Sequence, residues 1–238
     1  KLYVFILHIL LPPFYYISTT LERTLQKGAV CVFQIIQKLY IIVTEVNKMI
    51  DFKEEVLKHK DEMLKDLKDL CLIPSTLDKS TAKENQPFGE NNRKALDLML
   101  SIGQRDGFVT DDCDGYAGSI DIGEGEECFG ILGHLDVVPT EGQEWDYPEY
   151  DMTLDGDTLY GRGVADDKGP LIAAYYAAKI VNELDFEKKM KVRIIFGCNE
   201  ENGSRCMHYY FQHRPYPKMG FTPDADFPVV YGSAKNGW

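Results

Sequence analysis

The sequence lacks closely spaced cysteines and long apolar runs, and each absence excludes a class of protein. Its six cysteines are scattered, with no C-x-x-C pair. They therefore indicate neither a disulfide framework nor a thiolate zinc site, and a reducing, cytoplasmic setting is the simplest expectation. The apolar stretch "LYVFILHILLPPFYYI" (2–17) is interrupted by Pro12-Pro13. It is also shorter than the about 20 residues that a membrane-spanning helix needs.

Positive charge is scarce as well. Lysine and arginine number 26 against 38 acidic residues, which gives a net charge of −12 without a basic stripe. Nucleic acids and anionic membranes both bind basic surfaces, so neither is expected as a partner. The remaining composition, 44% hydrophobic and 27% charged over 238 residues, is ordinary for a globular protein of one large domain.

The first 48 residues differ from the rest of the chain. They carry a charge of +3, whereas residues 49–238 carry −15, and Met49 opens an amphipathic helix. We therefore expect 1–48 to be an N-terminal extension outside the domain and 49–238 to be the domain itself. A membrane anchor is the alternative. A signal peptide would need a small-residue cleavage site, and none is obvious before Ser18.

From Met49 onward, helical and strand patterns alternate. The strand–helix–strand order predicts an α/β fold with a mixed, largely parallel sheet flanked by helices. The predicted elements are helices over 49–73 and 91–107, short strands within 108–134, a long loop over 137–162, a helix ending near 184 with Pro170 in its first turn, a strand over 191–198, a short helix over 204–214 and a strand over 227–232.

One strand, "FGILG", ends by presenting His134 and Asp136. Residues i and i+2 of an extended chain share a face, so the two side chains point out of the strand end together. This arrangement has two interpretations. The pair is either a packed histidine with an aspartate partner or a metal ligand with the acid that orients it.

Three further acidic segments lie at the ends of predicted elements. One precedes a helix, one follows a strand and one precedes the last strand; they are Asp166-Asp167, Glu200-Glu201 and Asp224. Taken singly, they are typical of a helix cap, a solvated face and a turn. Sites in open α/β sheets form at the carboxyl ends of strands, so we expect the three segments to meet there. Crowded carboxylates repel one another, and one imidazole with several carboxylates suits a divalent metal, zinc above all.

These segments together resemble the di-zinc exopeptidases of the aminoacylase/carboxypeptidase family, and most closely its PepV dipeptidase branch. The resemblance covers about residues 52–232. It is carried by "GHLDVVP", "EGQEWDYPEYDMTLDGDTLYGRGVADDKGP", "IIFGCNEENGSRCMHYYF" and "GFTPDADFPVVYG".

The resemblance implies a zinc-dependent dipeptidase that uses a metal-activated water, and it implies a role for six residues. His134 would bind the first zinc, Asp136 would orient that imidazole, Asp166 would bridge both ions next to a cis Asp166–Asp167 peptide bond, Glu200 would be the general base, Glu201 would bind the second zinc, and Asp224 would complete the first site. The expected substrate is a dipeptide or a small amino-acid derivative. Side-chain preference and oligomeric state stay open.

Family members continue beyond the point that corresponds to Trp238, with a lid domain and the rest of the catalytic domain. We therefore expect this chain to be the N-terminal part of a catalytic domain, an inactive fragment that binds about one zinc ion. Two alternatives remain. One is an amidohydrolase or deacylase of amino-acid derivatives in the same family, and the other is a non-catalytic metal-binding remnant.

Overall fold

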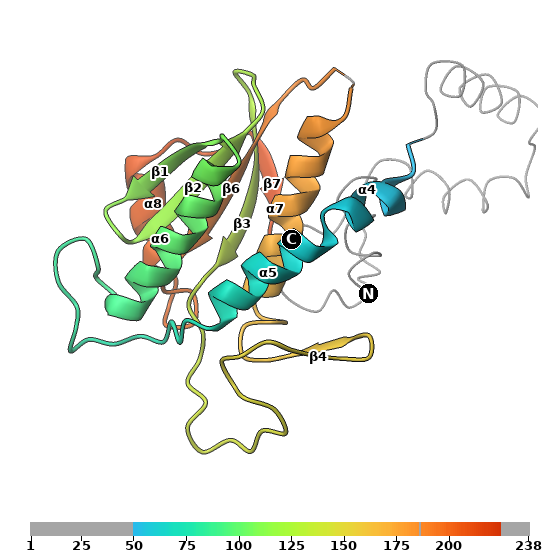
Figure 1. The fold of residues 1–238 in the computed structure, drawn as a ribbon. Helices are drawn as coiled ribbons and strands as arrows, with labels where there is room; N and C mark the ends of the chain where they lie inside the picture. The colour runs from blue at the N-terminus through green and yellow to red at the C-terminus, as the bar shows by residue number, and fades with distance from the viewer. Residues whose placement is uncertain (1–49, 186, 225–238) are drawn as a thin grey trace, which may run out of the picture. The chain divides into compact units, whose positions relative to one another are not determined.

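The computed structural model describes residues 50–185 and 187–224 (Figure 1). The chain divides into two compact units, Lys1–Asp61 and Glu62–Trp238. The predicted N-terminal extension and the strand expected over 227–232 both lie outside the described residues. Within the described residues, no helix combines the length and the apolar character needed to cross a membrane.

The single helix predicted over 49–73 is two helices in the structure, α4 (Phe52–Lys58) and α5 (Lys60–Cys71). α4 begins where the Asp51 carboxylate accepts hydrogen bonds from two backbone N–H groups of the first turn. It ends with His59 as its C-cap. Neither proline nor glycine marks this break, so the apolar spacing alone predicted one continuous helix.

Five strands form one mixed sheet in the order β1-β2-β6-β3-β7. The strands are β1 (Val109–Cys113), β2 (Ala117–Ile122), β3 (Cys128–His134), β6 (Lys191–Gly197) and β7 (Met219–Phe221). β2 pairs antiparallel with β1 and β6, whereas β3 pairs parallel with β6 and β7. The mixed α/β fold is therefore as predicted, and its parallel part is the half that contains β3.

Helices cover both faces of this sheet (Figure 1). They are α6 (Glu90–Arg105) and α7 (Lys168–Glu183) on one face and α8 (Arg205–His213) on the other. Side chains alternate along β6 accordingly: Ile195 packs with Tyr210 of α8, and Phe196 lies with Leu96 of α6. α7 is apolar almost all round, and its residues from Lys168 to Ile180 are buried except for Pro170.

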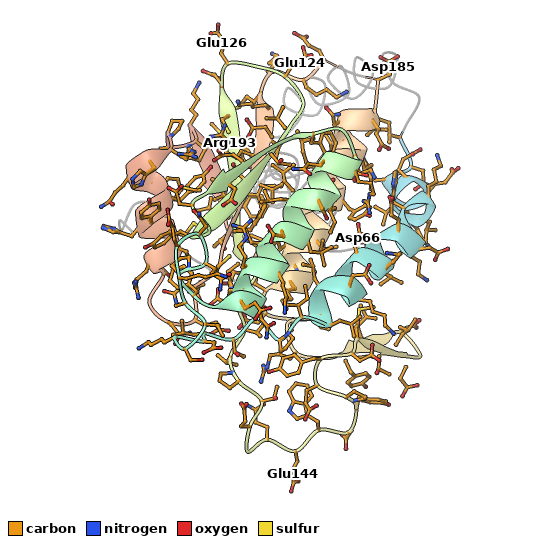
Figure 2. All side chains as sticks on the ribbon, turned by 60° about the vertical axis from the view of Figure 1, so that its left-hand side comes forward. Asp66, Glu124, Glu126, Glu144, Asp185 and Arg193 are labelled. Carbon is orange, nitrogen blue, oxygen red and sulfur yellow. The ribbon has the colours of Figure 1, made fainter. Side chains whose placement is uncertain are left out.

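The loop expected over 137–162 contains a short hairpin that the sequence analysis missed. Its strands are β4 (Thr153–Asp155) and β5 (Thr158–Tyr160). Gly156 lies in the two-residue turn between them with φ 58°, a left-handed conformation that glycine adopts readily. Glu144 is exposed in the part of the loop before the hairpin (Figure 2).

A network of charged and hydroxyl groups joins α5, α6 and α7. Asp66 of α5 is buried, and its carboxylate accepts hydrogen bonds from Arg105 (2.8 and 3.0 Å) and from the hydroxyl of Tyr176 (2.7 Å) (Figure 2). Directly after α6, Asp106 accepts a hydrogen bond from Lys179 of α7 at 2.9 Å. These buried polar groups of the three helices are thus paired with one another.

Candidate metal centre

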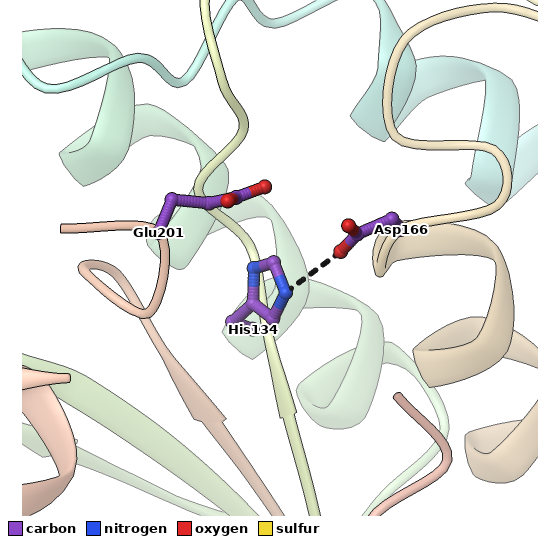
Figure 3. Close-up of side chains that lie close together, drawn as sticks. All are labelled: His134, Asp166 and Glu201. Carbon is purple, nitrogen blue, oxygen red and sulfur yellow. Dashed lines mark ion pairs between the residues drawn. The ribbon is translucent and has the colours of Figure 1, made fainter. Parts of the chain in front are cut away.

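His134, the last residue of β3, has a buried imidazole with two different surroundings. Its Nδ1 lies 2.9 Å from the backbone oxygen of Asp136 and 3.5 Å from the Oδ1 of the same residue. Its Nε2 is buried and makes no hydrogen bond with any described residue, although Asp166 Oδ1 lies 3.0 Å away (Figure 3). Buried polar atoms normally have a partner. This nitrogen is therefore available to bind a ligand from outside the chain, such as a metal ion.

Carboxylates from separate segments surround that nitrogen. Asp224 Oδ2 lies 3.5 Å and Glu200 Oε2 lies 3.9 Å from His134 Nε2. The side chains form two overlapping groups in which one atom per residue lies within 4.8 Å of the others: His134, Asp166 and Glu201, and His134, Glu200 and Asp224. The structure therefore brings together the four predicted metal ligands and Glu200. Each glutamate lies in one of the two groups, so both are within reach of a metal bound beside His134.

The topology of the sheet explains why these residues meet. In the parallel pair β3–β6, His134 lies opposite Gly197, and both are the last residues of their strands. Glu200 and Glu201 follow β6, and Asp224 follows β7, which is also parallel to β3. These segments consequently leave the sheet at the same edge, as expected. Asp224 does so by following β7, a strand that the sequence analysis missed, whereas it was expected to precede a strand.

Asp136 does more than the sequence analysis expected. Its carboxylate is buried and accepts hydrogen bonds from the backbone N–H of Glu200 (2.9 Å) and of Glu201 (3.1 Å). The backbone oxygen of Asp136, and not its carboxylate, accepts the hydrogen bond from Nδ1 of His134. Asp136 thus orients the turn that carries both glutamates as well as the imidazole.

Asp167 is a site residue to which the sequence analysis gave no role. The Asp166–Asp167 peptide bond is cis, as the resemblance implied. Asp167 forms no side-chain cap on α7; its Oδ2 instead accepts a hydrogen bond from the backbone N–H of His134 at 3.0 Å. A Cβ at Gly133 would come within 2.5 Å of that oxygen, so glycine is required there. The feature of the sequence that could have pointed to Asp167 is its position as the second of two consecutive acidic residues.

The electrostatics of the cluster show an excess of negative charge. Burial lowers the pKa of His134, but the hydrogen bond and charge of Asp136, with the charge of Asp167, outweigh it and raise that pKa to about 10. Burial raises the pKa of Asp167 to about 8, although the charge of His134 opposes the shift. Burial also raises the pKa of Glu200 and of Glu201. A divalent cation would offset this crowding of carboxylates.

The donor set fits such an ion. One imidazole nitrogen, surrounded by carboxylate oxygens and without a partner in the described part of the chain, is the mixed N/O set that zinc accepts in catalytic sites. The other described histidines of this region, His208 and His213, lie on the surface of α8 and contact Gln212 and Tyr209 of their own helix. They do not join the cluster.

Fold and site together define an α/β domain with a candidate divalent-metal centre at the carboxyl edge of its sheet. Residues 130–236 match the model of Peptidase family M20/M25/M40. A Staphylococcus epidermidis protein named "Putative dipeptidase" is 45% identical over 181 residues, which is 76% of this chain and 38% of that protein. "Putative dipeptidase YtjP" of Bacillus subtilis is 40% identical over 180 residues, 76% of this chain and 39% of that protein.

Two solved structures share the fold. Human carnosine dipeptidase 1 superposes with a TM-score of 0.56 at 21% identity, over 72% of this chain and 41% of that one. The M20 family metallo-carboxypeptidase Sso-CP2 of Sulfolobus solfataricus gives 0.54 at 18% identity, over 69% and 37%. Residues 130–236 are therefore similar to part of a peptidase M20 family domain. The chain spans less than two fifths of the length of the two curated relatives.

Proposed function

We propose that this chain is part of a zinc-dependent dipeptidase. The observation that carries the proposal is the buried Nε2 of His134, which has no hydrogen-bond partner among residues 50–185 and 187–224 and faces three carboxylates at 3.0–3.9 Å. The relatives named as dipeptidases support the choice of substrate. Because the chain spans only part of their length, the activity proposed is that of the whole protein.

His134, Asp166 and Asp224 would hold one zinc ion, and Asp166 with Glu201 would begin the site of a second. When bound, zinc lowers the pKa of a water molecule and polarises the scissile carbonyl of the substrate. Glu200 would accept the proton of the attacking water on a carboxylate oxygen and return it to the leaving amine. Asp136 and Asp167 would keep His134 in position through hydrogen bonds, and Asp136 would also keep the turn with Glu200 and Glu201 in position.

The proposal is tested by the zinc content of the purified chain after equilibration with zinc and removal of the free ion. Three ligands and an open position are sufficient for catalytic-type zinc, whereas the described residues supply only two for the second ion. We expect about one zinc per chain and little or no hydrolysis of dipeptides. His134→Ala should abolish the binding, and His213→Ala should leave it unchanged. Equal zinc content in the His134→Ala variant would refute the proposed centre.

A further inference from the structure

The 70–75 turn, which begins in the last turn of α5, contacts both the loop that follows His134 and the loop that carries Asp166, although none of its own residues belongs to the cluster. On one side, the backbone oxygens of Leu70 and Ile73 accept hydrogen bonds from Lys168 Nζ at 2.9 and 2.8 Å. On the other side, Ser75 Oγ donates to the backbone oxygen of Leu135 at 2.6 Å. The backbone oxygen of Ser75 accepts from the N–H of Val137 at 3.1 Å.

Lys168 directly follows the Asp166–Asp167 pair and is fully buried. An unpaired ammonium group is costly to bury, so its contacts with two carbonyl oxygens are needed to keep it there. Leu70 lies in the last turn of α5 and Ile73 lies just beyond it, at the end where the helix dipole favours a cation. A Cβ at Gly163 would come within 2.9 Å of Lys168 Cδ and 3.3 Å of Val137 Cγ1. The aliphatic part of the Lys168 side chain is therefore tightly packed beside Gly163 and close to Val137.

The hydrogen bonds of Ser75 lie immediately beside the other half of the cluster. Leu135 stands between His134 and Asp136, and Val137 follows Asp136. Displacement of Ser75 would therefore move the strand end from which the imidazole projects. The 70–75 turn is thus attached through Lys168 to the loop that carries Asp166, and through Ser75 to the segment that follows His134.

We propose that Lys168 and Ser75 are positioning residues of the metal centre, and that the 70–75 turn sets the separation between Asp166 and His134. This inference rests on the proposed metal site and adds residues that do not contact the ion. Loss of either attachment would widen or skew the ligand set without removing a ligand. Outer residues that orient metal ligands typically contribute about 10- to 100-fold to metal affinity.

A purely structural role for Lys168 is separated from positioning by a matched control on the same helix. Lys179 of α7 is also a buried lysine, but it pairs with Asp106 (2.9 Å) and Glu62 (3.0 Å) in the network of α5, α6 and α7. Replacement of either lysine by methionine keeps an unbranched side chain, one atom shorter, and removes its charge. Both variants should lose thermal stability, whereas only the one at 168 should disturb the metal.

The experiment measures zinc affinity by competition with a chelator and the visible spectrum of the cobalt-substituted centre, on the full 238-residue chain. Lys168→Met should bind zinc about 10- to 100-fold more weakly, with changed intensity of the cobalt bands. Ser75→Ala, a smaller change, should shift both readings in the same direction. Lys179→Met should match the wild type in both.

Wild-type affinity and spectrum in both Lys168→Met and Ser75→Ala would overturn the inference while leaving the metal centre intact. An equal loss in Lys179→Met would also overturn it, because general loosening would then explain the effect. If Lys168→Met does not fold, Ser75→Ala against Ser119→Ala, a buried serine of β2, decides the question alone. A wild-type chain that binds no zinc would instead refute the proposed centre itself, and this inference with it.

Discussion

The carboxylate of Asp136 accepts one backbone N–H on each of its oxygens, from Glu200 and from Glu201. Asparagine has one acceptor oxygen, so its amide NH₂ would face one of these N–H groups. We expect Asp136→Asn to displace the glutamate turn and to weaken zinc binding by about 10- to 100-fold in a chelator competition.

Asp114 provides a control for this prediction because its carboxylate accepts a hydrogen bond from Tyr209 on the surface of the protein. Asp114→Asn should keep wild-type zinc affinity. If Asp136→Asn also kept it, the two hydrogen bonds would not be what holds the glutamates in place.

The adjacent residues Glu200 and Glu201 should respond differently to the same substitution. In a full-length relative with the same motifs, Glu200→Gln should retain zinc and lose about 10²- to 10⁴-fold in turnover, because an amide cannot accept the proton of the water. Glu201→Gln should lose the second zinc instead. Steady-state kinetics with metal analysis of both variants checks the assignment, and the reverse pattern would exchange the two roles.

Among the elements, the contact between α6 and α7 depends on a carboxylate whose charge is stabilised by its neighbours. Burial raises the pKa of Asp106, but hydrogen bonds from Arg105, Tyr175 and Lys179 outweigh burial and lower it from 3.8 to about 2. A carboxylate with a lowered folded-state pKa stabilises the protein above its unfolded-state pKa, and the contribution is lost as the pH falls through the folded-state value.

Asp106→Asn should therefore lower the free energy of unfolding at pH 7 by about 1–2 kcal/mol. The difference from the wild type should shrink between pH 4 and pH 2. Urea unfolding at pH 7, 4 and 2.5 measures this, with the exposed Asp155→Asn as the control. A difference that stayed constant over this range would show that the charge of Asp106 is not its source.

For the molecule as a whole, we expect residues 1–48 to be dispensable for the stability of the domain. They carry +3 where the remaining residues carry −15, and the amphipathic pattern begins at Met49. Deletion of 1–48 should leave the melting temperature nearly unchanged in calorimetry. A large decrease would place part of this segment in the core of the domain.

The predictable part of the site is the part that local chain geometry controls. His134 and Asp136 share a face because successive strand residues alternate, and a strand–helix–strand order places strand ends at one edge of a sheet. Both facts depend on neighbours in the sequence. For this reason, the α/β fold and the convergence of four acidic or histidine-bearing segments could be predicted from residue order alone.

The hydrogen-bond partners of the same residues could not be predicted. Asp167 reaches His134 across 33 residues, Asp136 reaches Glu200 across 64, and Lys168 reaches Leu70 across 98. Such contacts depend on how the sheet, α5 and α7 pack, which no local pattern encodes. The sequence by itself determined which side chains collect at the edge of the sheet. Only the tertiary structure decided which of them face the candidate metal centre and which hold it from behind, because a buried polar group must take whichever partner the packing brings within reach.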